Sequence, residues 1–199
     1  CSEEPIIEYA YIKNSFDLKS LLKKYGISEI CWYDYENNAD FCDKEGENVD
    51  WDAFGEELFS TFFGLEIPKL QIKSIEFTNI EPEGEGIDIS VNNTNDVLLY
   101  SKVTDEMYDI KIYSEKEIMF PEDSSNMFAE LYNLDELVLE NINTSRVIDM
   151  SSMFSTTGYS STNFTLNLGN HFNTSKVTDM SDMFYSTGRN STNFTLNLG

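Results

Sequence analysis

The chain has 199 residues and a formal net charge of −23 at pH 7, because 36 acidic side chains outnumber 13 basic ones. This acidity excludes the basic footprint that nucleic-acid-binding proteins need. A content of 40% hydrophobic and 14% aromatic residues indicates a folded protein, and no stretch approaches the roughly 20 apolar residues of a membrane helix.

The acidic excess is confined to the first part of the chain. In residues 143–199 three basic and three acidic side chains cancel, so the whole excess lies in residues 1–142. Such a front favours solubility and, if it binds specifically, a basic partner or a divalent cation.

The first residue suggests a location. Cys1 is followed by Ser-Glu-Glu, which looks like the mature end of a bacterial lipoprotein. A lipid on Cys1 would anchor an extracellular chain to the cell surface, so membrane contact is expected only through that anchor. The alternative is an arbitrary start. In an oxidising compartment Cys31 and Cys42 could form a disulfide, or they could be buried thiols.

Residues 1–68 are predicted to form an acidic α+β region. Strand and helix patterns alternate there, and the helices have one apolar face each. The expected strands are Ile6–Ile12 and Glu29–Tyr35, and the expected helices are Phe16–Tyr25 and Asp50–Phe63.

Eight acidic residues fall between Asp34 and Asp52, and oxygen-rich loops can hold calcium. The candidate ligands are Asp34, Glu36, Asp40 and Asp43. The spacing of a calcium loop with a closing Glu is missing, so the sequence predicts no metal site beyond these weak candidates.

Residues 69–121 are predicted to form a β-rich segment that caps the following repeats. Pro68 marks its start, and Pro82, Gly84 and Gly86 indicate a turn. The expected strands are Leu70–Phe77, Gly86–Val91, Val97–Tyr100, Tyr108–Tyr113 and Glu117–Phe120.

Residues 122–199 contain a repeat. Aligning 143–169 with 173–199 leaves 20 of 27 positions identical, and a degenerate unit with Met127 and Leu137 precedes them. Repetition at this period predicts a solenoid in which each unit buries its apolar side against the next. The alternative is a recent duplication whose copies do not stack.

Each unit shows two apolar periods. Phe194, Leu196 and Leu198 have strand spacing, whereas Val177, Met180, Met183 and Phe184 have helix spacing. The expected fold is therefore an α/β leucine-rich-repeat-like solenoid with a short strand and a short helix per repeat, after the α+β region. Stacked strands would place Thr165 over Thr195 and Asn167 over Asn197 on the outside.

The repeat also carries a family resemblance. The segment Thr174-Ser-Lys-Val-Thr-Asp-Met-Ser-Asp-Met-Phe184 resembles the repeat of BspA-like leucine-rich-repeat surface proteins, which include mycoplasma and Firmicute surface lipoproteins. Ser155 and Tyr185 stand where that family often has Cys. The resemblance covers about residues 70–199 and implies a surface-displayed, non-enzymatic module, in some members an adhesin.

A second likeness lies in the acidic region. The segment from Gly46 to Leu58, with Trp51-Asp-Ala-Phe54 at its centre, is similar to barstar-like ribonuclease inhibitors. It implies a salt-sensitive complex with a basic nuclease, although the start of an amphipathic helix explains the same residues.

No catalytic arrangement is expected. The single histidine, His171, lies in a repeat turn, and the sequence has no phosphate-binding Gly-rich loop and no paired-Cys zinc spacing. No enzymatic activity and no cofactor are therefore predicted.

The leading interpretation is a binding or adhesion module of the bacterial cell surface. Its partner would be a protein or glycan on a host or neighbouring cell. The expected ligand-facing positions are Thr165, Asn167, Thr195, Asn197, Tyr159 and Arg189. The alternatives are the inhibitor and a purely structural protein. The array stops at Gly199 without a polar capping unit, which indicates either a fragment of a longer repeat array or head-to-tail association.

Overall fold

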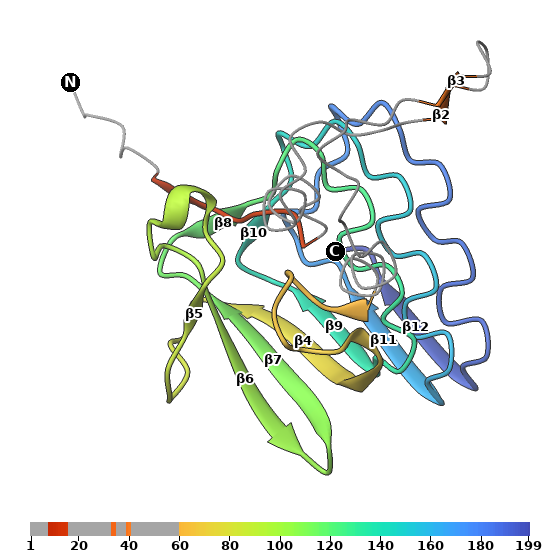
Figure 1. Cartoon of the computed structure of the whole chain (residues 1–199), viewed down its shortest axis with the longest axis horizontal. Helices are drawn as coiled ribbons and strands as arrows, with labels where there is room; N and C mark the ends of the chain where they lie inside the picture. The colour runs from red at the N-terminus through yellow and green to blue at the C-terminus, as the bar shows by residue number, and fades with distance from the viewer. Residues whose placement is uncertain (1–7, 16–32, 35–38, 41–59) are drawn as a thin grey trace.

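The computed structural model describes residues 8–15, 33–34, 39–40 and 60–199. Within them the main element is a seven-stranded sheet of order β12-β11-β9-β4-β7-β6-β5 (Figure 1). The five strands from β12 to β7 run parallel, and β6 and β5 are antiparallel to their neighbours. The bounds are β4 Ile72–Thr78, β5 Ile87–Asp88, β6 Leu98–Thr104, β7 Met107–Tyr113, β9 Glu136–Leu139, β11 Asn163–Asn167 and β12 Asn193–Asn197.

Two smaller sheets complete the strand inventory of the described residues. The first is parallel, with the order β1-β8-β10, and its strands are β1 Tyr9–Tyr11, β8 Glu117–Met119 and β10 Ile142–Asn143. The second pairs β2 Tyr33–Asp34 with β3 Ala39–Asp40. Two 3₁₀ turns, η2 Lys69–Gln71 and η3 Val91–Asn93, flank β4 and β6.

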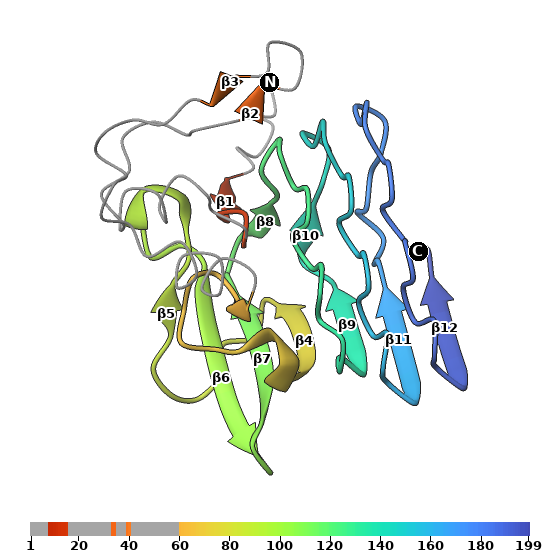
Figure 2. The same cartoon turned by 45° about the vertical axis from the view of Figure 1, so that its right-hand side comes forward.

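The repeats form coils that lie side by side. We call residues 122–140 the first coil, 143–169 the second and 173–199 the third; each contributes one strand to the large sheet (Figure 2). The expected register is confirmed, since Phe164 pairs with Phe194, Thr165 with Thr195 and Asn167 with Asn197. The strand burial also alternates as expected, because Phe164 and Leu166 are buried and their neighbours are not.

The predicted helix in each repeat is wrong. Residues 122–199 are fully described and contain no α-helix. In its place, residues 150–161 and 180–191 form what we call turn ribbons, runs of overlapping turns in which an N–H donates to the carbonyl three residues earlier. The fold is therefore mostly β, not an α/β repeat with one helix per unit.

Hydrogen bonds between coils explain why the turn ribbon forms in place of a helix. The N–H groups of Met150, Ser152, Phe154 and Thr156 donate to carbonyls of the third coil at 2.8–2.9 Å. An α-helix would use these groups internally. Ser152 and Thr156 adopt φ values of 53° and 58°, which no right-handed helix contains.

Asp side chains begin each turn ribbon. Asp179 accepts a hydrogen bond from the Ser181 N–H at 2.9 Å, and this closes a turn. Asp149 does the same for Ser151 at 2.8 Å. Side-chain-to-backbone bonds of this kind favour turns over helices.

A stack of phenylalanine rings runs through the coils. Phe154 lies between Phe128 and Phe184 with centroid distances of 5.7 and 5.4 Å and nearly parallel planes. On the sheet side Phe164 stacks on Phe194 at 5.5 Å. Leu137, Leu166 and Ile75 are fully buried in one cross-strand row, so the apolar interior is continuous from β4 to the coils.

Several predictions for residues 1–68 fall outside the described residues. β1 lies within the expected strand Ile6–Ile12, and β2 within Glu29–Tyr35. The expected helix Phe16–Tyr25 and most of Asp50–Phe63 lie outside. The five strands expected in residues 69–121 are all present, with shifted ends.

We expect Phe154→Ala to lower the free energy of unfolding by about 3–5 kcal/mol, because it leaves a cavity between two stacked rings. Phe184→Ala is the matched control, since its ring is 40% exposed and should cost clearly less. Urea denaturation followed by far-UV circular dichroism measures both values. Equal losses would contradict the coil stacking.

The substitution Gly158→Ala distinguishes whether residues 150–161 form the turn ribbon or a helix. Gly158 has a φ of 64°, and an added Cβ would overlap the Phe164 ring. The substitution should therefore destabilise by more than about 1 kcal/mol, whereas in a helix it would stabilise. Thermal unfolding by circular dichroism measures the sign. Ser152→Gly, which relieves a positive φ, is expected to be neutral or stabilising.

Candidate functional site

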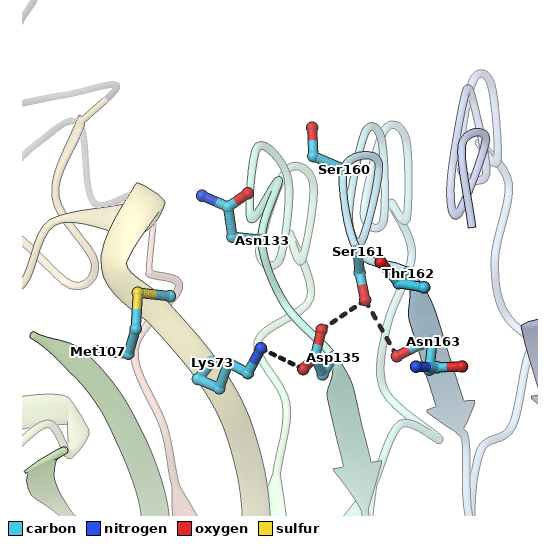
Figure 3. A pocket seen from close by; sticks show the side chains of 8 residues that line it. All are labelled: Lys73, Met107, Asn133, Asp135, Ser160, Ser161, Thr162 and Asn163. Atoms are coloured by element: carbon cyan, nitrogen blue, oxygen red, sulfur yellow. Dashed lines mark hydrogen bonds and ion pairs between the residues drawn. The ribbon is translucent and has the colours of Figure 1, made fainter. Parts of the chain in front are cut away.

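An open polar groove lies where β4, β9 and β11 begin. Its volume is about 580 Å³ (Figure 3). The lining side chains come from the strand starts, the β6–β7 hairpin and the end of one turn ribbon: Lys73, Met107, Asn133, Asp135, Ser160, Ser161, Thr162 and Asn163.

Asp135 is the centre of the groove's polar contacts. Its carboxylate forms an ion pair with the Lys73 ammonium and accepts a hydrogen bond from the Ser161 hydroxyl at 2.5 Å. Ser161 also lies 3.0 Å from the Asn163 carbonyl (Figure 3). The Lys73 and Asp135 side chains keep about half and one third of their surface accessible, so both can contact a ligand.

The backbone holds these groups in place. The Asp135 N–H donates to the Lys73 carbonyl at 2.8 Å, and the Asp135 carbonyl accepts from the Thr165 N–H at 2.8 Å. Asn133 is tied through its amide to the Leu70 carbonyl at 2.8 Å. The groove is therefore built on the strand ladder and is pre-formed.

Next to the groove, β11 and β12 display the predicted polar positions. Thr165 and Asn167 are half-buried, and Thr195 and Asn197 are exposed in register beside them. The Asn167 and Asn197 side chains each accept a hydrogen bond from a following glycine N–H at 3.1 Å.

Sequence reasoning missed a further pair. The Asn193 amide donates to the Asn163 side-chain oxygen at 2.7 Å, which joins the second and third coils at the groove edge. Both residues are identical in the aligned repeats. The identity of these two asparagines at the start of each strand was the feature of the sequence from which the pair could have been predicted.

Tyr159 and Arg189 occupy equivalent positions on neighbouring coils. The Tyr159 carbonyl accepts from the Asn190 N–H at 3.1 Å, which aligns the two coils there. Tyr159 packs edge-to-face on Tyr132 at 5.8 Å, and its neighbour Ser160 lines the groove. The structure thus places Tyr159 next to the groove lining and Arg189 at the equivalent position of the third coil.

Most of the other predicted site residues lie outside the described part of the chain. Of the calcium candidates, Asp34 and Asp40 lie on β2 and β3, and Glu36 and Asp43 lie outside the described residues. No group of three or more metal-ligating side chains occurs among the residues that the structure describes. Cys1, Cys31, Cys42 and the segment from Gly46 to Leu58 also lie outside them.

His171 is exposed and contacts the Glu117 carboxylate. This contact does not connect it to the groove, whose lining residues include no histidine. Over the described part of the chain, no helix is long and apolar enough to cross a membrane.

Two pKa shifts concern the coils and their attachment. Burial lowers the pKa of Lys69, and Glu130 at 3.9 Å opposes that effect. Hydrogen bonds from the Ser181 backbone and hydroxyl lower the pKa of Asp179. A carboxylate with a lowered pKa stabilises the fold above its unfolded pKa and loses that effect as the pH falls through the folded value.

Comparison with known proteins identifies a family. No curated protein and no solved structure matches this chain. A family model described as "Mycoplasma protein of unknown function, DUF285" matches residues 99–198, which is just over half of the chain and includes all three coils. The chain belongs to this DUF285 family.

Proposed function

We propose that the chain is a non-enzymatic binding module of a bacterial cell surface. Its ligand is an extended polymer, a polysaccharide or an extended polypeptide of a host or neighbouring cell. The groove at the starts of β4, β9 and β11 holds one segment of the polymer, and the outer faces of β11 and β12 hold the next.

The in-register repetition of polar side chains carries this proposal. Asn163 and Asn193, Thr165 and Thr195, and Asn167 and Asn197 repeat across adjacent strands, which lie about 4.8 Å apart. A ligand with hydrogen-bonding groups at regular intervals can contact the same side chain again on the next coil.

The groove adds the chemistry that orients a ligand. Asp135 accepts, the Lys73 ammonium donates, and the Ser and Asn side chains can do both. The tyrosines at the coil edge offer ring surface beside these polar groups. The single histidine, His171, contacts Glu117 and does not line the groove.

Surface display is supported by the family and by the repeat. The family description names mycoplasma proteins, and the Met-Phe repeat resembles that of BspA-like surface proteins.

The groove is tested by binding to arrayed polysaccharides and extracellular-matrix proteins. Replacing Asn163 and Asn193 together by Ala should weaken binding of the array hits at least about tenfold, because two orienting contacts are lost. Ile80→Ala, at an exposed position outside the groove lining, is the control. Biolayer interferometry measures both; unchanged affinity in the double variant would rule out this surface.

A further inference from the structure

Lys73 and Asp135 are the only charged side chains among the described residues that line the groove. They form an ion pair with each other, and both remain partly accessible (Figure 3). A carboxylate or an amine of a ligand would be attracted by one member of this pair and repelled by the other. A hydroxyl group can donate to a carboxylate or accept from an ammonium. Two neighbouring hydroxyls of a ligand can therefore contact both members of the pair at once.

The ion pair keeps hydrogen-bonding capacity for such hydroxyls. One Asp135 oxygen accepts from the Ser161 hydroxyl at 2.5 Å, and the other contacts the Lys73 ammonium. Because a carboxylate offers roughly four acceptor positions and an ammonium about three donors, both groups can bond further partners. The Ser161 contact also holds the carboxylate in one orientation, so the groove presents it ready for a ligand.

An extended polypeptide fits the groove less well than a polymer of hydroxyl groups. Extended peptides are commonly bound at an open strand edge, where the two backbones form hydrogen bonds. The strands whose starts form the groove, β4, β9 and β11, each have a neighbouring strand on both sides. The N–H and carbonyl of Asp135 are both used by neighbouring chain segments. Only side chains are therefore available to a ligand in the groove.

The spacing of the coils also differs from the repeat of a polypeptide. Neighbouring strands lie about 4.8 Å apart, whereas an extended polypeptide presents side chains on one side about every 6.7 Å. A polyproline helix presents the same side only after three residues, or about 9 Å. A pyranose ring linked through opposite positions advances a polysaccharide by close to one strand spacing. Consecutive rings can therefore contact Asn163 and Asn193, which occupy the same position on consecutive coils.

The charge of the chain narrows the kind of polysaccharide. The net charge is −23, and a protein with such an excess repels polyanions at a distance. The one basic side chain of the groove, Lys73, is already paired with Asp135. An anionic polysaccharide would therefore find no unpaired positive charge in the groove to offset this repulsion.

We propose that the groove binds a neutral polysaccharide, with two vicinal hydroxyls of one sugar ring held between Lys73 and Asp135. The Met107 side chain on the groove wall provides apolar surface for the C–H groups of the same ring. The next ring lies against Asn163 and Asn193. This inference rests on the proposed function, because it names the class of polymer that the same groove binds.

The polymer class is tested with the 199-residue chain against arrayed neutral polysaccharides, heparin and gelatin. We expect neutral polysaccharides to bind with an affinity that changes less than about twofold between about 50 mM and 0.5 M NaCl, because the ligand carries no charge to be screened. Periodate cleaves the carbon–carbon bond between vicinal hydroxyls, so treating the bound polysaccharide with it should abolish binding. Neutral polysaccharide binding that survives this treatment overturns the contact with vicinal hydroxyls.

The Asn163 and Asn193 double variant separates a wrong polymer class from a wrong binding surface. If only heparin or gelatin binds, and the double variant weakens that binding, the neutral polysaccharide is overturned and the proposed function stands. If no arrayed polymer binds, or if the double variant leaves binding unchanged, both are overturned.

Two variants test the ion pair itself. Lys73→Met and Asp135→Asn should each weaken binding of the neutral polysaccharide at least about tenfold, because each removes a charged hydrogen-bonding partner. Lys111→Met is the matched control, since it breaks the exposed ion pair of Lys111 with Glu76 at 3.1 Å on the same sheet but outside the groove lining. It should change the affinity less than about twofold. Biolayer interferometry measures all three; equal effects of the three variants, or no effect of the first two, overturn the proposal.

Discussion

Backbone hydrogen bonds between neighbouring turn ribbons are the interaction on which the coils depend. Phe128 donates to Met153 and Phe154 donates to Met183, each at 2.9 Å, so every coil is held to the next at equivalent positions. This register stacks the phenylalanine rings face to face and aligns the strands of the large sheet. The same register therefore has two effects. It buries the phenylalanine rings inside the coils, and it repeats Thr and Asn side chains on the outside.

The sequence predicted which repeat residues are buried better than it predicted their backbone. Met150, Met153 and Phe154 follow helix spacing, and all three are buried. The turn ribbon buries residues in pairs every four positions, as in Met153–Phe154 and Thr157–Gly158, so it produces the same spacing as a helix. The positive φ values at Ser152 and Thr156 separate the two, and serine and threonine carry no signal for them. The strand was predictable because, among these structures, only a strand produces a two-residue period of buried side chains.

The groove was not predictable, because long-range pairing creates it. In the sheet, β4 lies between β9 and β7. In the chain the order differs, because β7 follows β4 and precedes β9. Only this insertion puts Lys73 beside Asp135, and only the next coil adds Ser161 and Asn163. Local periodicity indicates that each strand exists, but it gives no information about the sequence in which the strands lie side by side in a sheet. The surface positions Thr165 and Asn167 could be predicted because they depend on the repeat alone.

The unequal distribution of charge along the chain limits electrostatic repulsion between the second and third coils. The second and third coils together have no net charge, whereas residues 1–142 carry the whole excess of −23. A neutral coil can lie against another neutral coil without repulsion, and its apolar interior supplies the attraction. A high net charge of one sign in residues 1–142 favours solubility. The contact between the second and third coils therefore involves no net charge, whereas the first coil, which packs on the second, carries six acidic side chains and no basic one in residues 122–140.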